Sequence, residues 1–284
     1  MHANRQKLVV FKNIKATMSL EEMRKLLTAK NPELATLVSK PRADTAVYPH
    51  WEIALNATAT LRFLPDGNSD NPIFWVERDM VKLPFAGIKG KPEIKPLQVI
   101  VPCMQMYDEE CPVLQEVRTW MKDPTLEEMA RRYWKKRSYF YQGFVRESPF
   151  RESDAPKNPI RQFIIGPQIH SLVLNMLLHR DLLESPCDIE RGMDFTIKKT
   201  DKSGYASYDQ SYWAFKESAL SKTEREAVDV YGLKDLGTRR PPKPNAEAVR
   251  VISEMFEASI DGEMYDADRW AKYFAPYGLT TKSS

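Results

Sequence analysis

The chain has 284 residues, of which 42% are hydrophobic and 29% are charged, with a formal net charge of only +3 at pH 7. This is enough apolar content for one large core or two smaller ones. The weak charge excludes a histone-like polycation but allows a basic surface that is balanced by acidic residues elsewhere. No run of 18 apolar residues, no signal-peptide pattern and no disulfide framework is present, so we expect no membrane association and a cytoplasmic location.

Residues 1–40 are expected to form an arm with a short helix of its own. Ser19 and Glu22 have capping-box spacing, which satisfies free backbone N–H groups at the start of a helix. The apolar residues that follow share one helical face: Leu20, Met23, Leu26 and Leu27. The arm either docks on the body of the protein or touches a neighbouring subunit or nucleic acid.

The central part of the chain, residues 41–240, is expected to be a β-rich core with helical additions. Strand patterns cover about 57–64, 72–78, 138–147, 161–165 and 193–200. A helix is expected at 167–183, between the last two strands, and another at 221–231, where Ser221 and Glu224 have capping-box spacing. The Pro-, Gly- and Lys-rich stretch 81–101 is expected to leave the sheet, with one strand-like run at Leu97 to Val101, and to open a helical insertion at about 82–135.

This order of elements predicts an α+β fold, with a five-stranded antiparallel OB-fold barrel, a helical insertion subdomain and peripheral helices. The segment 241–284 begins with the stiff linker Pro241-Pro242-Lys243-Pro244 and is expected to be helical from Asn245. It either docks on partner proteins or caps the core.

The stretch from Arg131 to Phe144 carries the strongest functional pattern. Five of its first seven residues are basic, and aromatic residues are interleaved with them. Basic side chains attract phosphates without reading base sequence. Aromatic faces stack on unpaired bases, at ~1–3 kcal/mol per base. The pattern therefore predicts the floor of a groove for single-stranded nucleic acid, while the alternative is a helix end that runs into a half-buried strand.

Other candidate contacts lie on neighbouring elements. Arg62 is in the first strand, beside an aromatic strand, and Arg161 with Phe163 is in the fourth. Residues 205–215 contain five aromatics in eleven positions, next to Lys199. The alternative for these residues is that the charges are solvated and the aromatics fill a core.

The order of four short motifs resembles that of the helix-destabilising, single-stranded DNA-binding proteins of T-even-type phages (gene 32-like proteins). The motifs are Ala59-Thr60-Leu61-Arg62-Phe63-Leu64-Pro65, Cys103 followed by Asp108-Glu109-Glu110-Cys111-Pro112-Val113, Lys135-Lys136-Arg137-Ser138-Tyr139-Phe140, and Ala206-Ser207-Tyr208-Asp209. The resemblance covers residues 57–215. It implies an OB-fold core, sequence-tolerant binding of single-stranded DNA in phage replication, recombination and repair, and head-to-tail self-association through the arm.

The resemblance also assigns DNA contacts to the residues that fall within its motifs. These are Arg62, Lys135, Lys136, Arg137, Tyr139, Phe140 and Tyr208. Five further candidates come from charge and aromatic placement alone: Arg161, Phe163, Lys199, Tyr205 and Tyr212. Because Tyr139 and Phe140 alternate along a strand, only one of them can face the groove, and we favour Tyr139.

Two features depart from the family pattern. Its zinc site uses three cysteines and one histidine, whereas here Cys103 and Cys111 remain and Leu114 occupies the position of the third cysteine. Two thiolates are too few for a closed tetrahedral site, so we expect a remnant of a zinc motif and no cofactor, with bound zinc as the alternative. The family's acidic tail, which recruits replication and recombination proteins, is replaced by a nearly neutral end.

An enzyme is the main alternative. A metal-dependent nuclease or other phosphoryl-transfer enzyme needs converging carboxylates or histidines. The cluster Asp108-Glu109-Glu110 has no histidine nearby in sequence, and neither a P-loop nor a nucleophile-elbow motif occurs. We therefore expect no catalytic residues. A protein-interaction module with an aromatic surface is a third possibility.

Overall fold

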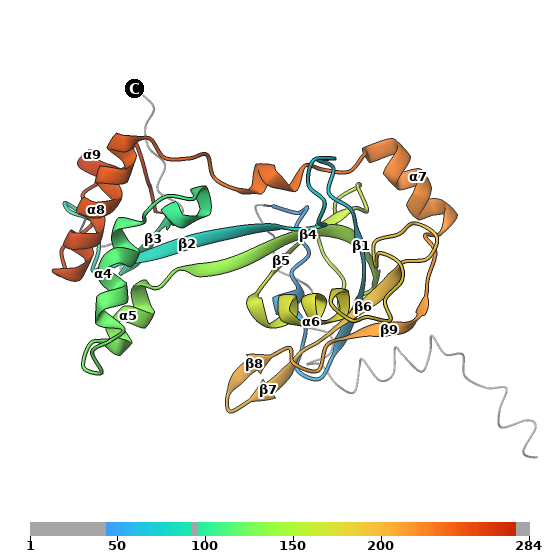
Figure 1. Ribbon diagram of the computed structural model, residues 1–284. Coiled ribbons are helices and arrows are strands. Elements are labelled where there is room, and N and C mark those ends of the chain that lie inside the picture. The colour runs from blue at the N-terminus through green and yellow to red at the C-terminus, as the bar shows by residue number, and fades with distance from the viewer. Residues whose placement is uncertain (1–43, 92–95, 277–284) are drawn as a thin grey trace, which may run out of the picture.

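Two long strands, β2 (Val76–Phe85) and β4 (Lys136–Glu147), pair with each other and connect the two lobes of the molecule (Figure 1). The computed structural model describes residues 44–91 and 96–276. The predicted arm at 1–40, with its docking or self-association role, lies outside the described residues. No helix within these described ranges is long and apolar enough to cross a membrane.

The main sheet has seven strands, and every strand pair in it is antiparallel. Its hydrogen-bonded order is β3-β2-β4-β1-β6-β9, and β5 pairs with β4 outside that path. The remaining strands are β1 (Thr58–Leu64), β3 (Leu97–Pro102), β5 (Arg161–Ile165), β6 (Met193–Lys198) and β9 (Tyr212–Glu217). Over the described residues this sheet is open, so the α+β class is confirmed and a closed five-stranded barrel is not.

The aromatic lobe is built from β1, β5, β6, β9 and the second half of β4, with α6 (Pro167–Leu177) packed against them. Phe63 lies at its centre, where its ring contacts five other aromatic rings at centroid distances of 4.9–5.9 Å. These rings belong to Phe74, Tyr141, Phe163, Phe195 and Trp213. Edge-to-face and tilted pairs of this kind add to the hydrophobic gain of burial. Trp213 and Phe163 are thus core residues.

The helical lobe combines the insertion with the C-terminal segment. It contains η2 (Met104–Tyr107), α4 (Pro112–Trp120), α5 (Glu127–Tyr133), α8 (Ala246–Ile260) and α9 (Ala267–Trp270), packed on β2 and β3. Trp120 stacks on Phe256 with ring centroids 5.6 Å apart, and the hydroxyls of Tyr133 and Ser259 are hydrogen-bonded. The segment after 241 therefore completes the core of the insertion.

The structure differs from the sequence prediction between residues 81 and 101. We expected this stretch to leave the sheet. Instead, β2 and β3 continue the sheet as an antiparallel pair from Met80↔Pro102 to Phe85↔Leu97. Alternating apolar residues of β2, such as Val81 and Leu83, are fully buried under the helices, which keeps the strand in the sheet despite the flanking prolines and glycines.

A strap crosses from one lobe to the other between α7 (Lys222–Tyr231) and α8 (Figure 1). It includes η3 (Leu236–Arg239) and the proline-rich linker. Arg240 Nε donates to the Glu77 carbonyl (2.9 Å), and Tyr107 Oη donates to the Pro241 carbonyl (2.6 Å). At the start of α7, the predicted capping box of Ser221 and Glu224 is confirmed.

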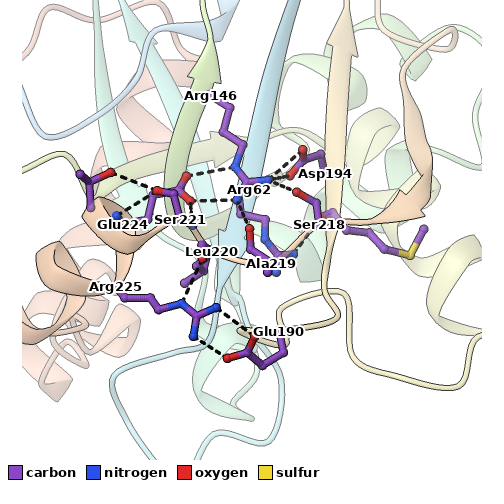
Figure 2. A network of polar contacts seen from close by, with 12 residues as sticks. Arg62, Arg146, Glu190, Asp194, Ser218, Ala219, Leu220, Ser221, Glu224 and Arg225 are labelled. Atoms are coloured by element: carbon purple, nitrogen blue, oxygen red, sulfur yellow. Dashed lines mark hydrogen bonds and ion pairs between the residues drawn. The ribbon is translucent and has the colours of Figure 1, made fainter.

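Arg62 lies in a network of polar contacts within the aromatic lobe (Figure 2). Its side chain is fully buried, and its guanidinium donates to the carbonyls of Pro186, Asp188 and Met193. A Cβ at Gly192 would overlap that guanidinium, so the loop can close over Arg62 only because this residue is glycine. Burial lowers the pKa of Arg62 from its usual value. Arg62 was predicted to contact DNA; in this structure a loop covers the face on which it lies, and its guanidinium is not accessible to a ligand.

Arg146 of β4 lies beside Arg62 and joins three elements (Figure 2). Its guanidinium pairs with Asp194 of β6 (2.7 Å) and with Glu224 of α7 (2.9 Å). It also donates to Ser218 and to the Ala219 carbonyl. These half-buried contacts fix α7 to the sheet.

We expect Arg62→Leu to lower the free energy of unfolding by about 3 kcal/mol or more, because three buried carbonyls lose their donor. Chemical denaturation measures this change. The matched control is Arg180→Leu, whose side chain is 93% exposed and whose loss is expected to change stability little. If Arg62→Leu left stability unchanged but lowered the affinity for DNA, Arg62 would have to contact DNA directly.

Candidate nucleic-acid interface

The basic ribbon, which we define as Lys135, Lys136 and Arg137, lies where β4 leaves the helical lobe. Arg137 makes a bidentate contact with Asp79, in which both distances are 2.8 Å, and Lys135 Nζ donates to the same carboxylate (2.7 Å). Arg137 also pairs with Glu77 (3.1 Å). Two of the three predicted phosphate contacts thus already have anionic partners.

Asp79 is the buried centre of this cluster. Burial by itself would raise the pKa of Asp79, but the hydrogen bonds from Arg137 and Lys135 hold it below its usual value. The same contact with Asp79 raises the pKa of Arg137. The carboxylate therefore stays ionised and holds both cations in fixed positions, with part of the Arg137 side chain exposed to solvent.

Lys136 points to the face of β4 opposite to the face of Arg137, as strand alternation requires. It is exposed, and its ammonium donates to the Arg131 carbonyl (3.1 Å). Neither Lys136 nor the exposed Arg132 makes an ion pair with any described residue. These two side chains are the cations of the stretch that are most available to a phosphate.

The two aromatic rings predicted in this stretch are both covered. Tyr139 is buried and stacks on His170 of α6, with ring centroids 3.4 Å apart and planes at 12°. Phe140 is buried on the other face, and the Arg78 guanidinium lies 4.4 Å from its ring centroid. Neither of the two rings predicted to stack on bases has a free face in this structure.

Arg161 and Phe163 are also structural in their placement. Arg161 is buried and pairs with Glu152 (2.6 Å), and its guanidinium donates to the carbonyls of Thr45 and Val47. Phe163 is a fully buried ring of the aromatic core. Strand β5, on which both lie, is covered on each face, and an alternating pattern cannot show that by itself.

The remaining predicted aromatics surround a hairpin formed by β7 (Thr200–Lys202) and β8 (Tyr205–Ser207). Tyr205 is 78% exposed and Tyr212 is 51% exposed. Tyr208 is half-buried, and its backbone N–H donates to Gln168 Oε1 of α6 (2.8 Å). The hairpin projects from the aromatic lobe below α6 (Figure 1). Here the structure leaves rings accessible.

A tryptophan that the sequence analysis missed lies at the base of this hairpin. Trp51 belongs to the short helix η1 (His50–Glu52) and is 43% exposed. Lys199 Nζ donates to its carbonyl (2.7 Å), and the His50 ring contacts both Trp51 and Tyr208 edge-on. We call His50, Trp51, Lys199 and Tyr208 the hairpin corner. No local motif marks Trp51, because its exposure depends on contacts that are distant in sequence.

The first turn of α6 connects the basic ribbon to the hairpin corner. On one side, His170 stacks on Tyr139, which follows Arg137 by two residues. On the other, Gln168 bonds to Ser207 and to the Tyr208 backbone. A single helical turn therefore separates Tyr139, which Arg137 precedes by two residues, from the hairpin that carries the accessible aromatics.

The two cysteines of the insertion lie in the core of the helical lobe. Cys103 and Cys111 are buried, and their thiols are hydrogen-bonded to each other. This bond, together with backbone N–H groups such as that of Leu114, lowers the pKa of Cys111. Within the described part of the chain, no group of three or more His, Cys, Asp or Glu side chains could hold a metal ion.

Two buried histidines make stability depend on pH. Burial lowers the pKa of His50 and of His170 from 6.5 to about 4, and the positive charges of Lys199 and Arg137, respectively, add to the effect. The unfolded chain therefore binds more protons between pH 6.5 and 4. The stability that the neutral histidines contribute is present above pH 6.5 and is lost as pH falls toward 4, at a cost on the order of 3 kcal/mol for each histidine.

We accordingly expect the free energy of unfolding to fall between pH 6.5 and 4, and expect His170→Phe to reduce this slope. Chemical denaturation at a series of pH values tests both. His179, whose side chain is 60% exposed, provides the matched control, and His179→Gln should leave the slope unchanged. A wild-type slope that His170→Phe does not alter would contradict the assignment.

No protein-family model matches the chain, and no curated protein shows significant similarity to it. We therefore base the functional proposal on the placement, exposure and charge of the side chains described above.

Proposed function

We propose that the protein binds single-stranded DNA without base-sequence specificity. The observation that carries this proposal is the juxtaposition of exposed cations and accessible aromatic rings on either side of the first turn of α6. Arg137 lies on one side, with Lys136 next to it on the opposite face of the same strand, and Tyr205 and the hairpin corner lie on the other side. Cations bind any phosphate backbone, and an aromatic face stacks on any unpaired base.

The contacts of the basic ribbon set the electrostatic part of this binding. Because Asp79 and Glu77 already neutralise Lys135 and Arg137, fewer phosphates are bound than the count of basic residues implies. With about four phosphate contacts, log K should fall with log salt at a slope of roughly −3 for single strands. The stacked bases add affinity that depends little on salt.

The biological setting of the proposal comes from the resemblance of the four motifs. It supports an OB-like core in the aromatic lobe and a role in coating and protecting single strands during phage replication, recombination and repair. Self-association along DNA through residues 1–40, and contacts with phage replication or recombination proteins, complete the proposal. Binding of a long single strand that is more cooperative than binding of a short one would support self-association.

Loss of ribbon cations should weaken binding equally for all base sequences. We expect Lys136→Ala combined with Arg137→Ala to reduce affinity for oligo-dT and oligo-dA about tenfold, because phosphate contacts do not read bases. Fluorescence anisotropy of labelled oligonucleotides, with duplex as comparison, measures this at low and moderate salt. A thermal unfolding curve checks that the loss of Arg137 beside Asp79 leaves the fold intact.

The matched control removes the same charge elsewhere. Lys222 and Arg180 are both at least 90% exposed, and replacing both with Ala should leave affinity nearly unchanged. An absence of binding to single strands by the wild type at low salt would disprove the function. If wild type and the ribbon variant bound single strands with equal affinity, Lys136 and Arg137 would not contact the DNA. Cleavage of labelled strands with magnesium would point instead to a nuclease.

A further inference from the structure

We infer that the hairpin corner is a nucleotide-binding subsite in which a base stacks on the exposed face of Trp51 and the adjacent phosphate contacts Lys199. This inference rests on the proposed function and extends it to Trp51, a residue outside all the motifs considered above. It also identifies the indole that reports binding. The subsite accepts any base, because stacking uses the π-face that all bases share.

The exposure of Trp51 is the first observation behind this inference. The chain has six tryptophans, and all of them lie in the described ranges. Four are buried in the cores, and Trp134 is half-buried against the core of the helical lobe. Trp51 alone among the six is exposed, at 43%. Tryptophan is enriched at interfaces, where its apolar ring is buried by a partner, and this indole is available for such a contact.

The backbone on each side of Trp51 is fixed. Tyr48 and Ile53 are fully buried in the aromatic core, so the indole is attached to a short segment anchored at both ends. The turn of η1 is closed by the Glu52 N–H, which donates to the Pro49 carbonyl (2.9 Å). A ring held in place before binding loses less conformational entropy when a base stacks on it.

Lys199 places a cation directly beside the indole. One of the three donors of its ammonium bonds to the Trp51 carbonyl (2.7 Å), which leaves two for a phosphate oxygen. The Lys199 backbone is itself paired with the chain that follows η1, because the Asn56 N–H donates to the Lys199 carbonyl (2.7 Å). Charge and stacking face are thus held together within one nucleotide's length.

His50 supplies a second, independent observation. Its ring is more than nine-tenths buried, and its centroid lies 5.4 Å from that of Trp51. Its Nδ1 atom has no hydrogen-bond partner among the described residues. A buried polar atom without a partner is costly, and a bound group that brings a donor or acceptor to this corner would satisfy it.

The test follows tryptophan fluorescence and affinity together. Oligo-dT should quench the intrinsic fluorescence of the wild type, and Trp51→Phe should abolish most of the quenching while anisotropy still detects binding. Trp51→Ala should weaken binding about tenfold, since no ring remains to stack. The matched control, Trp134→Phe, should retain both the quenching and the affinity.

A second variant tests the phosphate contact of the subsite independently of Trp51. Lys199→Gln should weaken binding and make the salt slope shallower by about 0.7, the value for one lost phosphate contact on a single strand. If the wild type does not bind single strands at all, the proposed function fails, and the subsite fails with it. If the wild type binds but Trp51→Phe keeps full quenching and Trp51→Ala keeps full affinity, the subsite alone is overturned.

Discussion

The whole structure depends on the hydrogen bonding of β4. Its first half, Lys136–Phe140, pairs with β2, and its second half, Gln142–Glu147, pairs with β1. Its central residues also pair with β5 on the other edge. A Cβ at Gly143 would overlap the Arg62 carbonyl, so the close approach of β1 requires glycine there. Because one continuous strand belongs to both lobes, the basic residues at its start have a fixed position between them.

Buried cations explain why charge alone predicts the site poorly. Arg62, Arg146 and Arg161 all join elements that are distant in sequence, and each donates hydrogen bonds to carbonyls or carboxylates. A guanidinium taken from water must be paired in this way, since the unpaired charge is prohibitively costly. The cations left for a ligand are those without a buried partner, such as Lys136. This distribution agrees with the small net charge of the chain.

Local sequence patterns predicted the strands and helix caps well, but they did not predict which residues other segments of the chain would bury. The strand at 161–165 and the capping box of Ser221 are confirmed, because alternation and capping depend on adjacent residues. The alternation in this strand places Arg62 on the face opposite Phe63. In the structure, the loop that ends at Met193 covers the face on which Arg62 lies. The shared core of α8 and the insertion, and the exposure of Trp51, likewise arise from contacts between segments far apart in sequence. Periodicity carries no information about such contacts.

The two halves of the candidate surface differ in what a ligand must displace. A phosphate near Arg137 competes with the buried carboxylate of Asp79, whose contacts with both cations are short. A base that stacks on Trp51 displaces only water, and it buries an apolar face that is already held in place. Salt also screens the exposed charges but not the stacking. At physiological ionic strength the aromatic rings around the hairpin should therefore supply the larger share of the binding free energy, while the ribbon positions the strand.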